Sequence, residues 1–208
     1  NYDRKMEYLD KNNKDLLTRI TIYCMFLISF SAYFFIAYFI ESIPCPKWIS
    51  SIDKNIPFIW WMIIPYYFYY IILLLPPVLI KDIFKINFLT KTLIETSIFC
   101  YIIYILWPIS STDVLINVSH NPLFFLHNFI TFDFLHQNAF PSMHVSITTT
   151  IALAIVNENK KLNYQMYLSI ILIFFATFLI KQHYLVDSIS GLIIGYVGFL
   201  RYQKLLKT

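Results

Sequence analysis

Residues 164–201 read YQMYLSIILIFFATFLIKQHYLVDSISGLIIGYVGFLR, and they decide the fold class. The stretch holds two apolar runs, 164–181 and 184–201, each long enough to cross a bilayer, which takes roughly 17 to 25 residues per helix. Only a short polar group around Gln182 and His183 separates the runs, so the second helix must turn back directly after the first. The stretch therefore predicts a pair of antiparallel membrane-spanning helices.

Four further apolar runs come earlier in the chain, near 19–40, 57–80, 92–110 and 142–156. The last of these is short and holds one serine and three threonines, and the final run of the chain holds Asp187. Polar residues in a spanning helix need partners or a wet cavity. The runs predict an all-α polytopic membrane protein with a six transmembrane helix bundle. We expect a cytoplasmic N-terminal arm at 1–18, a membrane domain at 19–201 and a cytoplasmic tail at 202–208.

Composition supports the membrane interpretation. Of the 208 residues, 58% are hydrophobic and only 13% are charged, and a soluble domain of this size could not hide so much apolar surface. The net charge of +4 fits the topology and attraction to anionic lipid headgroups. No basic stripe is suited to nucleic acid, so we expect no nucleic-acid partner.

The distribution of the 16 Lys and Arg residues predicts the orientation. Thirteen lie in the N-terminal arm, in the loops after the second and fourth runs, and in the tail, whereas the opposite loops carry only Lys47, Lys54 and Lys181. Positively charged loops stay on the cytoplasmic side, so both termini are predicted to be cytoplasmic. The abundance of Asn, Ile and Lys suggests an AT-rich coding sequence, as in many bacteria, and we expect a bacterial inner membrane.

All five histidines lie between residues 120 and 183. With the fourth helix running inward and the fifth returning outward, His144 and His183 are predicted to meet at the outer surface, although 39 residues separate them. His120 and His127, each taken alone, are expected to be structural. Four tyrosines of the second run are expected to join an interfacial aromatic belt rather than a ligand site: Tyr66, Tyr67, Tyr69 and Tyr70.

The segment NAFPSMH at 138–144 reads as the start of a helix, with Pro141 at the first helical position. The first backbone N–H groups of a helix have no intrahelical acceptor, and together with the helix dipole they form an anion site. A phosphate could therefore sit over Ser142, Met143 and His144, with the Ser142 hydroxyl as a further donor.

The segment KQHYLVD at 181–187 places His183 and Asp187 four residues apart, which puts them on one face of a helix. A carboxylate that accepts a hydrogen bond from one imidazole nitrogen fixes the tautomer, and the other nitrogen is then a nucleophile or base. The two segments predict a catalytic pair of histidines with an orienting aspartate.

PSMH followed by HYLVD resembles the two downstream motifs of the type 2 phosphatidic acid phosphatase superfamily, which are Pro-Ser-x-His and Ser-Arg-x5-His-x3-Asp. The resemblance covers roughly residues 90–200 and implies a six-helix bundle that dephosphorylates lipids or transfers phosphoryl groups at its outer face. It implies that His183 attacks phosphorus to give a phosphohistidine, that His144 protonates the leaving alkoxide, and that Asp187 orients His183. No metal or other cofactor is implied.

The chain departs from the family pattern in its basic residues. The upstream Lys-x6-Arg-Pro motif is not recognisable, and Trp107-Pro108 stands near its expected place. The Ser-Arg pair reads Ala176 and Thr177, so a phosphate-binding Arg is missing, and Lys181 is expected to supply the cation instead. His136 and Asn138, just ahead of the PSMH segment, are further candidates for contact with phosphate oxygens.

The expected substrate is a membrane phospholipid, a polyprenyl diphosphate or a sphingolipid system. The degenerate first motif resembles the branch of inositol phosphorylceramide synthase-like proteins, so lipid head-group transfer stands beside hydrolysis. Two other interpretations remain open from the residues. The histidines and carboxylates could instead bind zinc in a metal-dependent hydrolase, or the chain could be a non-catalytic membrane protein of the same fold.

Overall fold

The computed structural model describes residues 2–110, 121–130 and 138–208, with the side chains of the first helix described from residue 13 onward. These residues are helical and contain no strand, which confirms the all-α class. The helices are α1 (Tyr2–Phe39), α2 (Lys47–Asp53), α3 (Ile63–Leu74), α4 (Pro76–Leu79), α5 (Ile83–Leu106), α6 (Phe124–Phe129), α7 (Met143–Glu158), α8 (Asn163–Leu179) and α9 (Leu185–Leu205). Two short 3₁₀ helices, η1 (Trp60–Met62) and η4 (Lys160–Leu162), precede α3 and α8.

Each of the six predicted runs contains a helix, namely α1, α3, α5, α7, α8 or α9. Within the described residues, four helical segments are long and apolar enough to cross a membrane: Asn13–Phe39, Ile83–Leu106, Lys160–Leu179 and Leu185–Leu205. The segment Trp60–Leu74 is apolar but shorter, and α7 has 16 residues. Four helices thus support the membrane assignment, and a count of six spans stays a prediction.

The helix ends differ from the predicted ones where capping and proline intervene. The α1 helix reaches back to Tyr2, so the predicted N-terminal arm is helical. The α5 helix begins at Ile83 rather than near 92, because the Asp82 side chain caps it by accepting a hydrogen bond from the Lys85 N–H at 3.1 Å. The second run is divided between α3 and α4 at Pro76, which has no N–H to donate.

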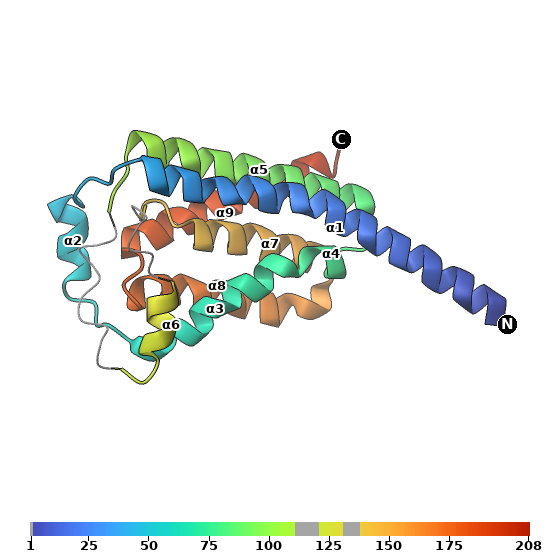
Figure 1. Ribbon diagram of the computed structural model, residues 1–208, viewed down its shortest axis with the longest axis horizontal. Coiled ribbons are helices and arrows are strands. Elements are labelled where there is room, and N and C mark those ends of the chain that lie inside the picture. Colours follow the sequence, from blue (N-terminus) through green and yellow to red (C-terminus); the bar gives the residue numbers. More distant parts are fainter. Residues whose placement is uncertain (1, 111–120, 131–137) are drawn as a thin grey trace.

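The α7 helix lies in the middle of the bundle, in contact with α3, α5, α8 and α9 (Figure 1). Most of its side chains are buried, including Ser146 and three consecutive threonines. The hydroxyl of Thr150 lies within hydrogen-bond distance of the carbonyls of Ser146 (3.0 Å) and Gly195 (2.9 Å). The short polar run therefore forms a helix that faces protein on all sides, which removes the cost of placing its hydroxyls against lipid.

Gly191 and Gly195 allow α9 to pack closely against α7. A Cβ at Gly191 would stand 2.4 Å from the Ser142 carbonyl oxygen, and one at Gly195 would stand 2.4 Å from the Ser146 carbonyl oxygen. Only glycine permits this approach of α9 to the backbone of α7. The two helices that carry the candidate motifs are therefore held in direct backbone contact.

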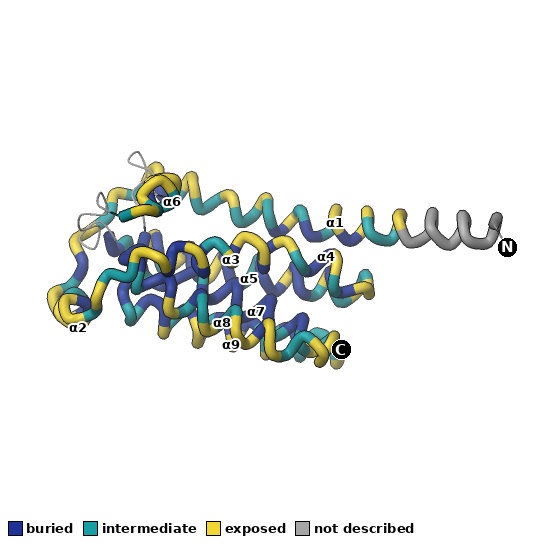
Figure 2. The backbone as a smooth tube through the Cα atoms, turned by 90° about the horizontal axis from the view of Figure 1, so that it is seen from below, coloured by how far each residue is buried: buried dark blue, intermediate teal, exposed yellow. Residues whose placement is uncertain are grey.

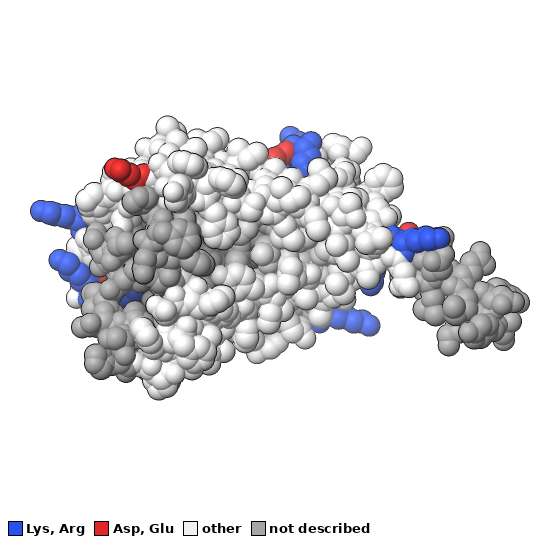
Figure 3. Space-filling model, viewed as in Figure 1, with Lys and Arg blue, Asp and Glu red and all other residues white. Residues whose placement is uncertain are grey.

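The outer surface of the bundle is apolar. Exposed positions follow the outward faces of the long helices (Figure 2), and they include Phe35, Phe84, Leu106 and Ile193, each more than half exposed. Most of the charged side chains visible in Figure 3 lie toward the two ends of the molecule, apart from a mixed basic and acidic group on its upper edge, and the belt between them is largely uncharged. Such a belt is the surface that a hydrocarbon layer would cover.

Candidate active site

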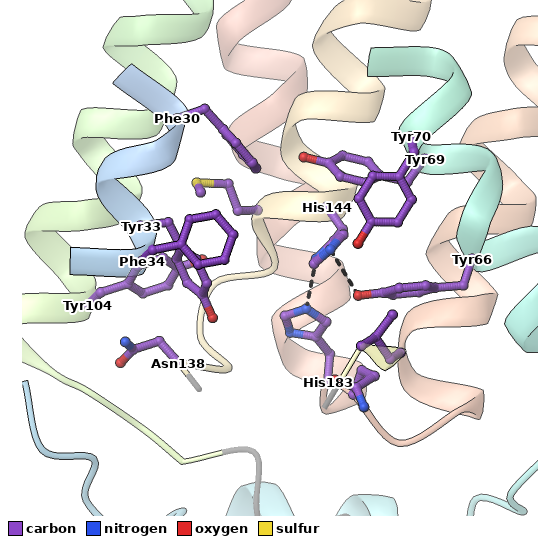
Figure 4. Close-up of a pocket in the computed structure, with 13 residues that line it drawn as sticks. Phe30, Tyr33, Phe34, Tyr66, Tyr69, Tyr70, Tyr104, Asn138, His144 and His183 are labelled. Atoms are coloured by element: carbon purple, nitrogen blue, oxygen red, sulfur yellow. Dashed lines mark hydrogen bonds between the residues drawn. The ribbon is translucent and has the colours of Figure 1, made fainter. Parts of the chain in front are cut away.

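His144 and His183 meet at one end of the bundle, as the antiparallel arrangement of the helices predicts. His144 belongs to the first turn of α7, and His183 lies in the connection between α8 and α9. The His144 Nδ1 and His183 Nε2 atoms are 3.3 Å apart (Figure 4), and the ring centroids are 5.5 Å apart. The predicted convergence of the two histidines is confirmed, while their chemical roles remain a prediction.

The tautomer of His183 follows from its second contact. Its Nδ1 atom lies 2.8 Å from the carbonyl oxygen of Ala139. A carbonyl can only accept a hydrogen bond, so Nδ1 carries the proton and donates it. In the neutral ring, Nε2 then keeps its lone pair, and this lone pair points toward His144.

His144 is enclosed by two tyrosines of α3. Its Nε2 atom is 2.9 Å from the hydroxyl oxygen of Tyr66, and this contact is the second dashed line of Figure 4. Its ring packs between those of Tyr66 and Tyr69, with centroids 4.9 and 4.6 Å away. Both ring nitrogens of His144 thus have partners, namely Tyr66 of α3 and His183 in the connection that precedes α9.

The histidine pair opens into an aromatic cavity of about 120 Å³ between α1, α3, α5 and α7. The lining residues are Phe30, Tyr33, Phe34, Tyr66, Tyr69, Tyr70, Tyr104, Ile130, Asn138, Met143, His144, Gln182 and His183. Met143 and Asn138, both predicted to contact phosphate, are among them. No Lys or Arg belongs to this described lining, so its polar groups are hydroxyls, amides and imidazoles.

Lys181 has a different partner from the one predicted. Its ammonium donates hydrogen bonds to the carbonyl oxygens of Asp53 (3.2 Å), the last residue of α2, and of Ile56 (2.7 Å), just after that helix. The side chain is buried and is not part of the described cavity lining. The cation that was expected to replace the missing arginine instead fastens the 53–56 segment to the end of α8.

Ser142 acts as a helix cap and does not line the cavity. Its hydroxyl accepts a hydrogen bond from the Val145 N–H at 3.5 Å, and its own N–H donates to the Asp187 carbonyl at 3.0 Å. The side chain is fully buried. Since α7 begins at Met143, Pro141 precedes the cap, and the prediction that it occupies the first helical position is wrong.

Asp187 lies near His183 without a hydrogen bond to it. Its Oδ2 atom is 3.7 Å from His183 Nδ1, whereas it accepts a 2.7 Å hydrogen bond from the Tyr184 N–H at the start of α9. Among the described residues, none donates to Asp187 Oδ1, and the side chain is fully buried. The Ala139 carbonyl therefore accepts the His183 proton, and Asp187 contributes a negative charge close to the ring.

The remaining histidines are less informative. His136 and His120 lie outside the described residues. His127 is buried in α6, and its Nε2 atom lies 2.9 Å from the Trp60 carbonyl, which fits the structural role expected for it. Desolvation by burial lowers the pKa of His127, although the Trp60 carbonyl opposes this shift.

The tyrosines of α3 were not recognised as site residues from the sequence. Tyr66, Tyr69 and Tyr70 line the cavity, which the expectation of an interfacial aromatic belt did not include. Their spacing of three and four residues places them on one helix face, and this was the signal available in the sequence. Trp107-Pro108, near the expected place of the basic motif, packs on Phe140 and provides a carbonyl that accepts from Ile43.

In the described ranges, no three His, Cys, Asp or Glu side chains come close enough together to hold a metal ion.

The fold and the site define a helical membrane protein with two facing histidines at the mouth of an aromatic cavity. The family model of the PAP2 superfamily matches residues 42–201, so the chain belongs to this superfamily, as the two histidine motifs predicted. Its members are generally phosphatases or phosphotransferases. No curated protein and no solved structure matches the chain.

Proposed function

We propose that the protein is a membrane enzyme that hydrolyses a lipid phosphate or diphosphate at the extracytoplasmic face through a phosphohistidine intermediate. The observation that carries this proposal is the tautomer of His183. The Ala139 carbonyl holds its proton at Nδ1, and the Nε2 lone pair is aimed at His144 beside the cavity. Such a nitrogen is a nucleophile that needs no further deprotonation.

In the first step, the His183 Nε2 lone pair forms a bond to phosphorus while the bond from phosphorus to the leaving oxygen breaks. The electron pair stays on that oxygen, which takes the Nδ1 proton of a doubly protonated His144. In the second step, water attacks the phosphohistidine and gives a proton back to His144 Nδ1. Phosphate leaves, and the N–P electron pair returns to His183.

The negative charge of the phosphoryl group is stabilised by neutral donors in this proposal. The N–H groups of Met143 and His144 begin α7 and have no intrahelical acceptor, so they can point at an anion. The Asn138 side chain and the tyrosine hydroxyls line the same cavity. No metal or other cofactor takes part.

Lipid head-group transfer of the inositol phosphorylceramide synthase-like kind is the second candidate function. It is favoured by a cavity in which hydroxyls and amides stand in place of Lys and Arg. A phosphodiester carries one negative charge and needs less compensation than the two charges of a phosphate monoester. The chemistry differs only in that a second lipid hydroxyl replaces water.

The location of the site is part of the proposal. The site lies at the end of the bundle that holds the 181–184 connection, which is the end assigned to the outer face by the positive-inside rule. With six spans, both termini are cytoplasmic, and the lipid substrate reaches the cavity from the outer leaflet of the inner membrane.

The test is phosphate release by detergent-purified protein from phosphatidate, phosphatidylglycerol phosphate and a polyprenyl diphosphate in EDTA. Wild type is compared with His183→Ala, and His127→Gln is the control for loss of a buried histidine outside the cavity. We expect release that survives EDTA, vanishes in His183→Ala and persists in His127→Gln.

If no lipid of the panel releases phosphate, transfer from a phospholipid to a ceramide or diacylglycerol acceptor is measured with the same variants. Absence of both activities would refute the enzymatic proposal and favour a non-catalytic membrane protein. Loss of release in EDTA with recovery on adding zinc would favour a metal-dependent hydrolase.

A further inference from the structure

The hydroxyl of Tyr66 makes a contact with the candidate site that neither histidine motif specifies. It lies 2.9 Å from His144 Nε2, and the Tyr66 side chain is buried. The neighbouring Tyr67 provides a contrast, because its hydroxyl donates to the Leu126 carbonyl at 2.9 Å and the residue does not line the cavity. Of these two tyrosines, Tyr66 is therefore the one that contacts a candidate catalytic histidine.

Three hydrogen bonds link Tyr66, His144, His183 and the Ala139 carbonyl in series. Because the carbonyl can only accept, it sets the direction of all three bonds. The Ala139 carbonyl accepts from His183 Nδ1, so His183 Nε2 must accept from His144 Nδ1. His144 Nε2 then has no proton in the neutral ring and accepts from the Tyr66 hydroxyl. All three bonds run in one direction, and the His144 proton is at Nδ1.

Halfway through the proposed reaction, the proton of neutral His144 must be on Nε2 instead of Nδ1. The proton that goes to the leaving oxygen comes from Nδ1, the atom that faces His183 Nε2. After this transfer the remaining ring proton is on Nε2 and needs an acceptor in a buried place, where an unpaired N–H costs about 1 to 3 kcal/mol. A hydroxyl can donate to Nε2 in the resting state and accept from Nε2–H afterwards, which neither a carbonyl nor an ammonium can do.

We propose that Tyr66 is a positioning residue that keeps the transferred proton at His144 Nδ1 by switching its hydroxyl from donor to acceptor during the cycle. This inference rests on the proposed function. The proton balance closes, because His144 takes up one proton with the anionic substrate, gives it to the leaving oxygen, recovers one from water and releases it with the product. Tyr66 itself gains and loses no proton.

The test compares Tyr66→Phe with the matched control Tyr67→Phe on two phosphate esters. Decyl phosphate has an alkoxide leaving group that needs a proton, and 4-nitrophenyl phosphate has a leaving group that departs without one. We expect Tyr66→Phe to slow the first-turnover release of decanol by on the order of 10- to 100-fold and to leave the first-turnover release of 4-nitrophenol nearly unchanged, because only this first step differs between the two esters. Tyr67→Phe, which also loses one partly buried hydrogen bond, should not separate the two esters.

An equal loss on both esters would mean that Tyr66 only supports the fold, and no loss on either would mean that His144 does not need it. Each result overturns the inference. The hydrogen bond is also measured without turnover, by ¹⁵N NMR of histidine-labelled protein with His144 assigned from His144→Gln.

The His144 Nε2 resonance is expected to move in Tyr66→Phe and to stay in place in Tyr67→Phe, and an unmoved resonance overturns the inference. If wild type releases phosphate from neither ester while the resonance does move, the proposed hydrolysis fails and the tyrosine–histidine contact stands. The two failures are thus distinguished.

Discussion

Gly191→Ala places a methyl group between the two helices that carry the histidine motifs. Its Cβ would stand 2.4 Å from the Ser142 carbonyl oxygen and 3.1 Å from Val145 Cβ. Ordinary contact begins at 3.4 Å, so α9 and α7 must separate by about 1 Å at this point. The Ser142 carbonyl is backbone and cannot rotate aside, which makes the cost larger than for contact with a flexible side chain.

The expected change in the free energy of unfolding of Gly191→Ala combines two opposing contributions. Overpacking against rigid backbone costs up to about 3 kcal/mol, and the better helix propensity of Ala over Gly returns about 1 kcal/mol. The net loss of about 2 kcal/mol corresponds to a fall in Tm of about 4 to 8 °C for a chain of this size. Because Ser142 precedes His144 by two residues, the same separation misplaces the histidine pair, and a misplacement of about 1 Å can lower the rate on the order of 100-fold.

The assays are thermal unfolding in detergent and phosphate release from the lipid that wild type prefers. Gly198→Ala is the comparison variant on the same helix, because its Cβ would meet side-chain hydroxyls, those of Thr150 (2.7 Å) and Thr96 (2.9 Å), and no backbone atom. Moving these hydroxyls costs about 1 kcal/mol per neutral hydrogen bond lost, which the better helix propensity of Ala offsets in part. We expect Gly198→Ala to keep its Tm within about 2 °C and most of its activity. If Gly191→Ala behaves like Gly198→Ala in both assays, the close approach of α9 to α7 does not hold the site.

Three other predictions concern Lys181, Asp53 and the orientation of the bundle in the membrane. Lys181→Met removes two hydrogen bonds from a buried ammonium, each worth about 1.5 to 3 kcal/mol. We therefore expect Tm to fall while KM changes little. A raised KM at unchanged Tm would instead support a phosphate-binding role for Lys181. Burial raises the pKa of Asp53, against the lowering effects of the Leu185 N–H and the Lys181 ammonium. The folded state therefore binds this proton more readily than the unfolded chain, and the contribution of Asp53 to stability falls as pH rises from its unfolded pKa through the raised one. The Tm of wild type minus that of Asp53→Asn should be larger at pH 4 than at pH 7, and a difference that grows toward pH 7 contradicts the assignment. In a background without Cys24, Cys45 and Cys100, an impermeant thiol reagent added to intact cells should label Lys54→Cys and not Lys161→Cys, and the reverse pattern would invert the proposed topology.

The amino-acid sequence by itself determined the helical class, the position of each long helix and the meeting of His144 with His183. These features depend on local quantities, namely the length of an apolar run, the charge of the loops and the order of the motifs. An antiparallel pair of helices returns the chain to the end from which it started, whatever the details of packing. The PAP2 superfamily match over residues 42–201 agrees with the motifs that the sequence displays.

Only the tertiary structure decided which atom each polar group meets. His183 donates to Ala139, 44 residues away, the Tyr66 hydroxyl pairs with His144 across 78 residues, and the Lys181 ammonium is held by the Ile56 carbonyl across 125 residues. From the sequence alone, Asp187 was the natural partner for His183 and phosphate the natural partner for Lys181. Partner choice depends on how each helix is rotated and how closely it packs against its neighbours, because a hydrogen bond is lost when a polar atom moves by about 1 Å. No local pattern in the sequence encodes that rotation.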